Sequence, residues 1–146
     1  MHARTILLGT ALTLTLGNAP VRAEELSRVG DLELHSAAVP TTELTPEAAR
    51  DYNVVVGPHR GLLTVTLLRK SRNGEARSVP GQVYAGAVNQ NNYLISIPIR
   101  EVQRGGDVYY LGEYRLAPPD TLRFIINANV QGRHLKGELT RVFQGP

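Results

Sequence analysis

The histidines that lie beyond the first 23 residues, His35, His59 and His134, are the side chains of this chain best suited to acid–base or metal chemistry. Protein metal sites combine closely spaced His, Cys, Asp and Glu ligands. No pair of these histidines has His-x-His or His-x₃-His spacing, and the chain has no cysteine. The pattern favours exposed histidines, and it predicts neither a metal site nor any other cofactor.

Nucleophilic catalysis has no local signature either. The serines lie in no Gly-x-Ser-x-Gly or Ser-x-x-Lys motif. The scattered Asp and Glu residues form no recognisable pair for glycoside hydrolysis, although a pair assembled in space leaves no mark in a sequence. We therefore expect a non-enzymatic protein, with a small hydrolase or metal-dependent enzyme as the alternative.

The first residues have the order of a secretory signal peptide: an early cation at Arg4, an apolar run from Ile6 to Leu16, and small residues up to Ala23. The apolar run is too short for a transmembrane helix, which needs about 20 residues. We predict cleavage after Ala23, export to the periplasm, a mature domain over residues 24–146 and no transmembrane segment.

The mature chain is nearly neutral. The formal charge of +3 includes Arg4 and Arg22, and it falls to +1 when the leader is removed. Nucleic-acid binders show a strongly basic patch or stripe, so nucleic acid is not predicted as a partner. An exported chain without cysteine also has no disulfide framework, and its stability has to come from a hydrophobic core.

Apolar residues that alternate with polar ones predict β-strands over most of the chain. Pro98 cannot donate to a ladder, so its strand is expected at a sheet edge, and Asn73-Gly74 predicts a type I′ hairpin turn. The expected fold is all-β, a single antiparallel immunoglobulin-like β-sandwich of about seven strands. The inward rows are Leu32 and Leu34; Leu63, Val65 and Leu67; a strand over Gln82–Val88; Tyr93, Ile95, Ile97 and Ile99; Val108 to Leu116; Leu122 to Val130; and Leu135 to Phe143.

One stretch, LTPEAARDYN, predicts a short helix at about 46–52. Thr45 is a favourable N-cap and Pro46 suits the first helical position. Two turns are marginal alone, so Leu44 and Tyr52 must pack against other elements. We expect this helix in a crossover that carries the chain to the opposite sheet.

A small apolar surface is predicted from the hairpin around RGGD. If Gln103 pairs with Val108, aromatic, apolar and arginine side chains meet on the outer face, a composition typical of interfaces. An envelope protein or envelope polymer is the expected partner; alternatively another segment, such as residues 24–28, covers this face. The candidate interaction surface consists of Arg100, Val102, Arg104, Tyr109 and Leu111.

Glu101 continues the inward row and is expected opposite Tyr110. An inward carboxylate is costly without a partner, so we predict a buried polar pair of Arg60 and Glu101, with the Tyr110 hydroxyl as the second choice. The alternative is that the strand end turns outward and leaves Glu101 in water.

Several segments together resemble one known family. They are VGDLELHSAAVPTTELTPEAARDYNVV, RGLLTVTLLRK, REV, DVYYLGEYRL and DTLRF, and the similarity covers nearly the whole mature chain, from about Val29 to Phe143. They resemble the domain of unknown function 4426 family, small exported proteins of Gram-negative bacteria. The resemblance implies fold and export but no catalytic residue. The expected function is a periplasmic binding or scaffolding module of the cell envelope, with the small enzyme as the alternative.

Overall fold

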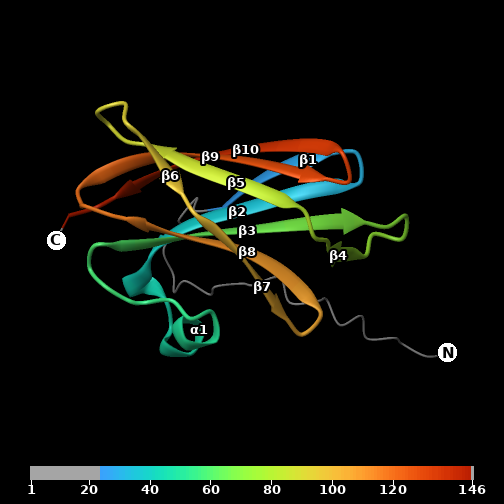
Figure 1. Ribbon diagram of the computed structural model, residues 1–146, viewed down its shortest axis with the longest axis horizontal. Helices are drawn as coiled ribbons and strands as arrows, with labels where there is room; N and C mark the ends of the chain where they lie inside the picture. Colours follow the sequence, from blue (N-terminus) through green and yellow to red (C-terminus); the bar gives the residue numbers. More distant parts are fainter. Residues whose placement is uncertain (1–23, 146) are drawn as a thin grey trace.

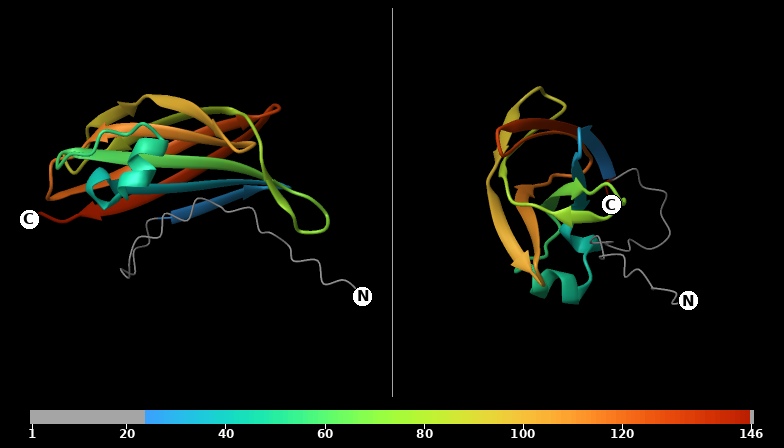
Figure 2. Two further views of the ribbon diagram at one scale, coloured as in Figure 1. Left: turned by 90° about the horizontal axis from the view of Figure 1, so that it is seen from below. Right: turned by 90° about the vertical axis from the view of Figure 1, so that its right-hand side faces the viewer.

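The computed structural model describes residues 24–145, which form two antiparallel β-sheets packed face to face (Figures 1 and 2). The predicted signal peptide, residues 1–23, lies outside the described residues.

The larger sheet has the order β1-β2-β3-β8-β7, with β4 beside β3, and the smaller sheet has the order β10-β9-β5-β6. The strands of the larger sheet are β1 Glu24–Val29, β2 Leu32–Pro40, β3 Arg60–Lys70, β4 Ala76–Ser78, β7 Ile99–Arg104 and β8 Asp107–Arg115. Those of the smaller sheet are β5 Gln82–Val88, β6 Leu94–Ile97, β9 Asp120–Val130 and β10 Arg133–Phe143.

The all-β antiparallel sandwich is confirmed, but the described chain has ten strands where about seven were expected. The additional strands are the edge strand β1, the three-residue β4, and a strand gained because the row around Pro98 is divided into β6 and β7.

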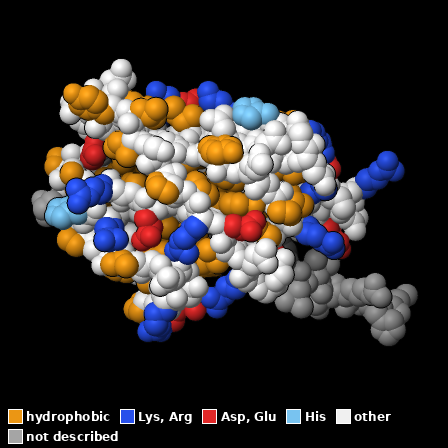
Figure 3. Space-filling model, in the orientation of Figure 1, with side chains coloured by type: hydrophobic (Ala, Val, Ile, Leu, Met, Phe, Trp, Pro, Cys, Tyr) orange, Lys and Arg blue, Asp and Glu red, His pale blue; other side chains and the backbone are white. Residues whose placement is uncertain are grey.

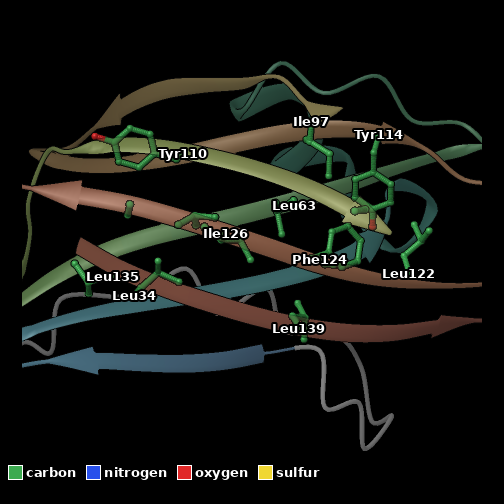
Figure 4. Packing of buried hydrophobic residues seen from close by; sticks show 14 of the residues in the cluster. Leu34, Leu63, Ile97, Tyr110, Tyr114, Leu122, Phe124, Ile126, Leu135 and Leu139 are labelled. Atoms are coloured by element: carbon green, nitrogen blue, oxygen red, sulfur yellow. The ribbon is translucent and has the colours of Figure 1, made fainter. Parts of the chain in front are cut away.

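The main core lies between the sheets and follows the predicted alternation. Along β9 the side chains of Leu122, Phe124 and Ile126 are buried, and so are Leu63 and its inward neighbours on β3. Figure 4 shows these side chains pointing into the space between the sheets. Burying one large aliphatic side chain stabilises a fold by about 1.5–3 kcal/mol, so this row supplies much of the driving force.

The chain changes sheets at Pro98. β6 pairs with β5 of the smaller sheet, whereas β7 pairs with β8 of the larger sheet, and the two form one diagonal band across the molecule (Figure 1). Proline has no N–H to continue a ladder, and both strands are edges, as predicted. The band passes close over Gly112, where a Cβ would lie 2.5 Å from Ile97 Cγ2 and 2.8 Å from Ile99 Cδ1.

The predicted inward row is only partly right. Ile97 is buried, but Tyr93 precedes β6 and is exposed. The type I′ turn is wrong as well, because Gly74 has a positive φ and Asn73 does not. The Gly74 N–H instead donates to the Ser71 carbonyl at 3.0 Å.

The short helix is confirmed as α1, Pro46–Asp51, and the Thr45 hydroxyl accepts the Ala48 N–H at 3.1 Å. A 3₁₀ turn, η1 Thr41–Glu43, precedes it. The predicted crossing to the opposite sheet is wrong, since β2 and β3 are antiparallel neighbours in one sheet. α1 lies outside the sandwich, against the outer face of the larger sheet (Figure 2). Neither helical segment of the described chain has the length and hydropathy of a membrane span.

Candidate functional site

The predicted interaction surface has the expected register but is not a free surface. Val102 faces Tyr109 and Arg100 faces Leu111, as the hairpin pattern indicated. Tyr109 and Leu111 are nevertheless buried. They belong to a second core on the outer face of the larger sheet, whose buried members are Val39, Leu44, Tyr52, Val54, Leu62, Tyr109 and Leu111, with Val102 packed against it. The prediction that these residues form a free surface is therefore wrong.

The covering segment is the η1–α1 loop rather than residues 24–28, which form β1 at the opposite edge of the sheet. The Tyr52 ring packs edge-on against Tyr109, with 6.0 Å between their centroids. Sequence reasoning found both halves of this core, but placed the helix on the way to the other sheet.

Arg100 and Arg104 hold α1 in place. Arg100 donates to the carbonyls of Tyr52 and Asn53 just after the helix, the second at 3.2 Å. Arg104 lies 3.0 Å from the Asp51 carboxylate, and its guanidinium lies 5.9 Å from the Tyr52 ring centre. Cations at a helix C-terminus complement its dipole, so both arginines serve the fold.

The predicted buried pair of Arg60 and Glu101 does not form. Glu101 does lie opposite Tyr110, but its side chain is exposed. Its Oε1 accepts a hydrogen bond of 3.0 Å from the Tyr110 hydroxyl, which was the second predicted partner of Glu101. Tyr110 pairs with Val65, whereas Arg60 lies five residues earlier on β3, or roughly 17 Å away at about 3.4 Å per residue. The pairing of β3 with β8 therefore separates the two residues.

Glu33 is a buried carboxylate that the sequence analysis missed. Its oxygens lie 2.7 Å from the Arg28 guanidinium, 2.9 Å from His35 Nε2 and 3.0 Å from Lys70 Nζ. Burial raises the pKa of Glu33, but the His35, Lys70 and Arg28 partners outweigh burial and lower it to about 2. Because the donors come from β1, β2 and the end of β3, this cluster joins neighbouring strands and is itself satisfied.

An open cleft of about 800 Å³ lies at the end of the sandwich where β3 begins and β8 ends. The change of sheet at Pro98 produces it. β7 starts opposite Gly112, so residues 113–115 of β8 have no described strand on that side, and β6 has joined the other sheet. Ile95 and Leu116 contribute apolar lining from the two sheets.

Two arginines from neighbouring strands supply positive charge to the cleft. Arg60 and Arg115 are directly opposite each other and exposed, and neither forms an ion pair with the described residues. Like charges at facing positions are destabilising. Figure 3 shows basic side chains beside a histidine at this end of the molecule.

The backbone that carries Arg60 is fixed by a buried threonine. The Thr41 side chain, fully buried in η1, lies 3.0 Å from the carbonyls of Gly57 and Arg60, and it accepts the Gly57 N–H at 3.1 Å. The Arg60 stem packs along Gly57, where a Cβ would lie 3.4 Å from Arg60 Cδ. The segment before β3 therefore forms one wall of the cleft, and its backbone is held in place by Thr41.

Two acidic residues and one histidine also line the cleft. They are His59, Glu113 and Asp120. One oxygen of Glu113 is buried without a hydrogen-bond partner among the residues that the structure describes. General acid–base catalysis needs groups within hydrogen-bond reach, and no such bond between the described side chains joins His59 to either acid. Within residues 24–145, no three potential metal ligands converge.

The other predicted histidines have structural partners. His35 bonds Glu33, and His134 Nε2 lies 3.0 Å from Asn127 Oδ1. The site suggested by the geometry is thus the cleft, of whose lining residues Arg60 and His59 were candidates from the sequence, each for another reason.

Comparison with known proteins gives a family and a fold. The family described as domain of unknown function (DUF4426) matches residues 26–143. A crystal structure of a DUF4426 family protein from Pseudomonas aeruginosa PAO1 is similar, with a TM-score of 0.69 and 22% identity over 85% of this chain and 97% of that one. At this identity the likeness shows the fold. No curated protein matches the chain.

Proposed function

The chain belongs to the DUF4426 family, and we propose that it is exported to the periplasm and acts there as a non-enzymatic binding module of the cell envelope. The export part rests on the signal-peptide pattern of residues 1–23. The binding part rests on one observation, the cleft beside the sheet switch, and the proposed occupant is part of an envelope protein or envelope polymer.

The cleft has the character of a binding site. Its volume of about 800 Å³ lies within the range of about 300–1,000 Å³ that is typical of ligand sites. It combines apolar walls, Ile95 and Leu116, with Arg60 and Arg115, which form no ion pair within residues 24–145. Such sites bind through a mostly apolar lining and orient the ligand by a few convergent polar groups.

In-cell photo-crosslinking tests this proposal. A photoreactive residue replaces Ile95, which lines the cleft and is partly exposed, in the full chain with its leader. The matched control carries the same residue in place of Lys136, which is exposed on β10 of the smaller sheet. We expect a defined adduct with one envelope component from position 95 and not from position 136.

Two outcomes would contradict the proposal. Equal adduct patterns from positions 95 and 136, or no adduct from either, would contradict binding of an envelope component at the cleft. N-terminal sequencing gives a separate check on export, because a processed chain begins at Glu24. A protein that kept Met1 and stayed in the cytoplasmic fraction would refute the location.

A further inference from the structure

We propose that the cleft binds the phosphate group of an amphiphile, with Arg60 and Arg115 holding the phosphate and the apolar rim holding its hydrocarbon. This inference rests on the proposed function, because it takes the cleft as the binding site, and it narrows the occupant to the part of an envelope polymer that carries a phosphate and a hydrocarbon chain.

The anionic group follows from the arginine pair. Arg60 and Arg115 face each other across β3 and β8, and both guanidinium groups lack an acidic partner among the described residues. Two like charges at facing positions repel. Because a guanidinium donates two parallel N–H bonds to an oxyanion, one phosphate between them would satisfy both and replace repulsion with attraction.

The acids of the cleft limit the size of that anion. Glu113 and Asp120 line the same cleft, and neither lies within ion-pair distance of either arginine. Two arginines and two carboxylates leave the cleft close to neutral. A polyanion that filled the cleft would meet both carboxylates, whereas a single phosphate between the arginines would have only Glu113 beside it, two residues from Arg115 on β8. The charge arrangement therefore favours one small headgroup.

The apolar part of the ligand follows from apolar residues in and beside the cleft. Ile95, which lines the cleft, is 36% exposed, and the lining residues Gly57 and Pro58 directly follow Val55 and Val56, which are also exposed. Exposed apolar groups gathered beside a polar site mark binding surfaces. A free phosphate or a sugar phosphate would leave these side chains in water, whereas a hydrocarbon chain would cover them.

NMR titration of the processed protein tests this ligand chemistry with three probes. Dodecyl phosphate below its micelle concentration supplies both groups, inorganic phosphate supplies only the head, and dodecyltrimethylammonium supplies the same tail with the opposite charge. We expect dodecyl phosphate to shift the amide resonances of Gly57, His59, Arg60 and residues 113–117. Its Kd should be at least ten times lower than that of inorganic phosphate. Shifts confined to other residues, no shifts, or equal binding of the ammonium probe would overturn the proposal.

Substitutions of the two arginines test whether Arg60 and Arg115 bind the phosphate. Arg60→Gln and Arg115→Gln should each weaken dodecyl phosphate binding about ten-fold or more, the order of one lost charge-assisted contact. Arg77→Gln removes the same charge from an exposed residue of β4 and should leave binding unchanged. If a glutamine variant fails to fold, Arg60→Lys and Arg115→Lys serve instead. Lysine keeps the charge but lacks the two parallel N–H donors of the guanidinium group, so each substitution should still weaken binding. An unchanged affinity for dodecyl phosphate in the folded variants would overturn the proposal that these arginines bind the phosphate.

Sedimentation with lipid vesicles distinguishes a site for one bound molecule from a surface that binds membranes. Phosphatidylglycerol vesicles that sediment the protein, in the absence of any binding to monomeric dodecyl phosphate, would assign this face to a membrane and overturn the single-ligand site. A crosslinked adduct from position 95 with no dodecyl phosphate binding would keep the proposed function and refute this inference. Dodecyl phosphate binding with no adduct would support the ligand chemistry and contradict the envelope-binding function.

Discussion

Removing the charge of Glu33, by acid or by Glu33→Gln, should weaken the fold in a pH-dependent way. The Glu33 side chain is only 3% exposed, and Arg28, His35 and Lys70 all lie within 3.0 Å of its oxygens. The uncharged amide would keep the shape of the side chain but lose its attraction to these three groups.

The magnitude follows from the pKa of Glu33, which lies at about 2 in the folded protein instead of its ordinary 4.5. At about 1.4 kcal/mol per unit, a difference of about 2.5 units corresponds to at most about 3.4 kcal/mol. The Arg28 and Lys70 side chains are 57% and 44% exposed, and solvent screening of such partners reduces the expected effect to roughly 1–2 kcal/mol. Because the folded pKa is lowered, this stabilisation is complete above the ordinary pKa and is lost as the pH falls towards the folded one.

Urea unfolding of the wild type and Glu33→Gln, measured from about pH 7 to about pH 2, checks this reasoning. The wild type should be more stable by roughly 1–2 kcal/mol at about pH 7, and the difference should shrink towards zero in acid. Glu138→Gln is the control, because Glu138 has one partner, Arg123 at 2.6 Å, and both are half-exposed; its effect should stay below about 0.5 kcal/mol. A Glu33→Gln difference that is independent of pH, or equal to that of Glu138→Gln, would refute the argument.

Three further substitutions test the packing by denaturant unfolding. Thr45→Ala should cost about 1 kcal/mol through loss of the helix cap, whereas Leu44→Ala should cost about 2–4 kcal/mol by opening a cavity in the second core; equal small effects would mean that this segment packs loosely. Gly112→Ala should destabilise by about 1–3 kcal/mol, because the new methyl group overlaps two isoleucine side chains of the sheet-switching band, and a neutral result would refute that close approach. Glu101→Gln and Arg60→Gln should add within about 0.5 kcal/mol, since the residues lie far apart; a coupling above that value would restore the rejected pair.

The sequence predicts those parts of the fold that short-range physics determines. The alternation of β9 identified side chains that are all buried, and Thr45 and Pro46 marked the start of α1 correctly. The register of β7 with β8 followed from the loop length at RGGD. These features depend on neighbours within a few positions, where the period of a strand and the chemistry of a cap leave little choice.

The errors concern which face a segment covers. Leu44 and Tyr52 were recognised as packing residues and Tyr109 as half of an apolar surface, yet nothing local says that they meet. Contacts of this kind, between residues that are far apart in the sequence, depend on the order of the strands in the sheet. Once β2 and β3 pair directly, the loop between them has to fold over the outer face of its own sheet, and the predicted free surface becomes the inside of a second core.

The cleft shows why the candidate site escaped the sequence analysis. Pro98 was correctly expected to interrupt a ladder, but a proline at an edge does not reveal that the chain leaves one sheet for the other. That change of sheet opens the end of β8, and the pairing of β3 with β8 then places Arg60 opposite Arg115. Neither arginine carries a motif, since each is an outward residue at the end of its strand. Their proximity arises only when both long-range pairings are in place, so the charge arrangement that suggests a ligand belongs to the fold rather than to any stretch of the sequence.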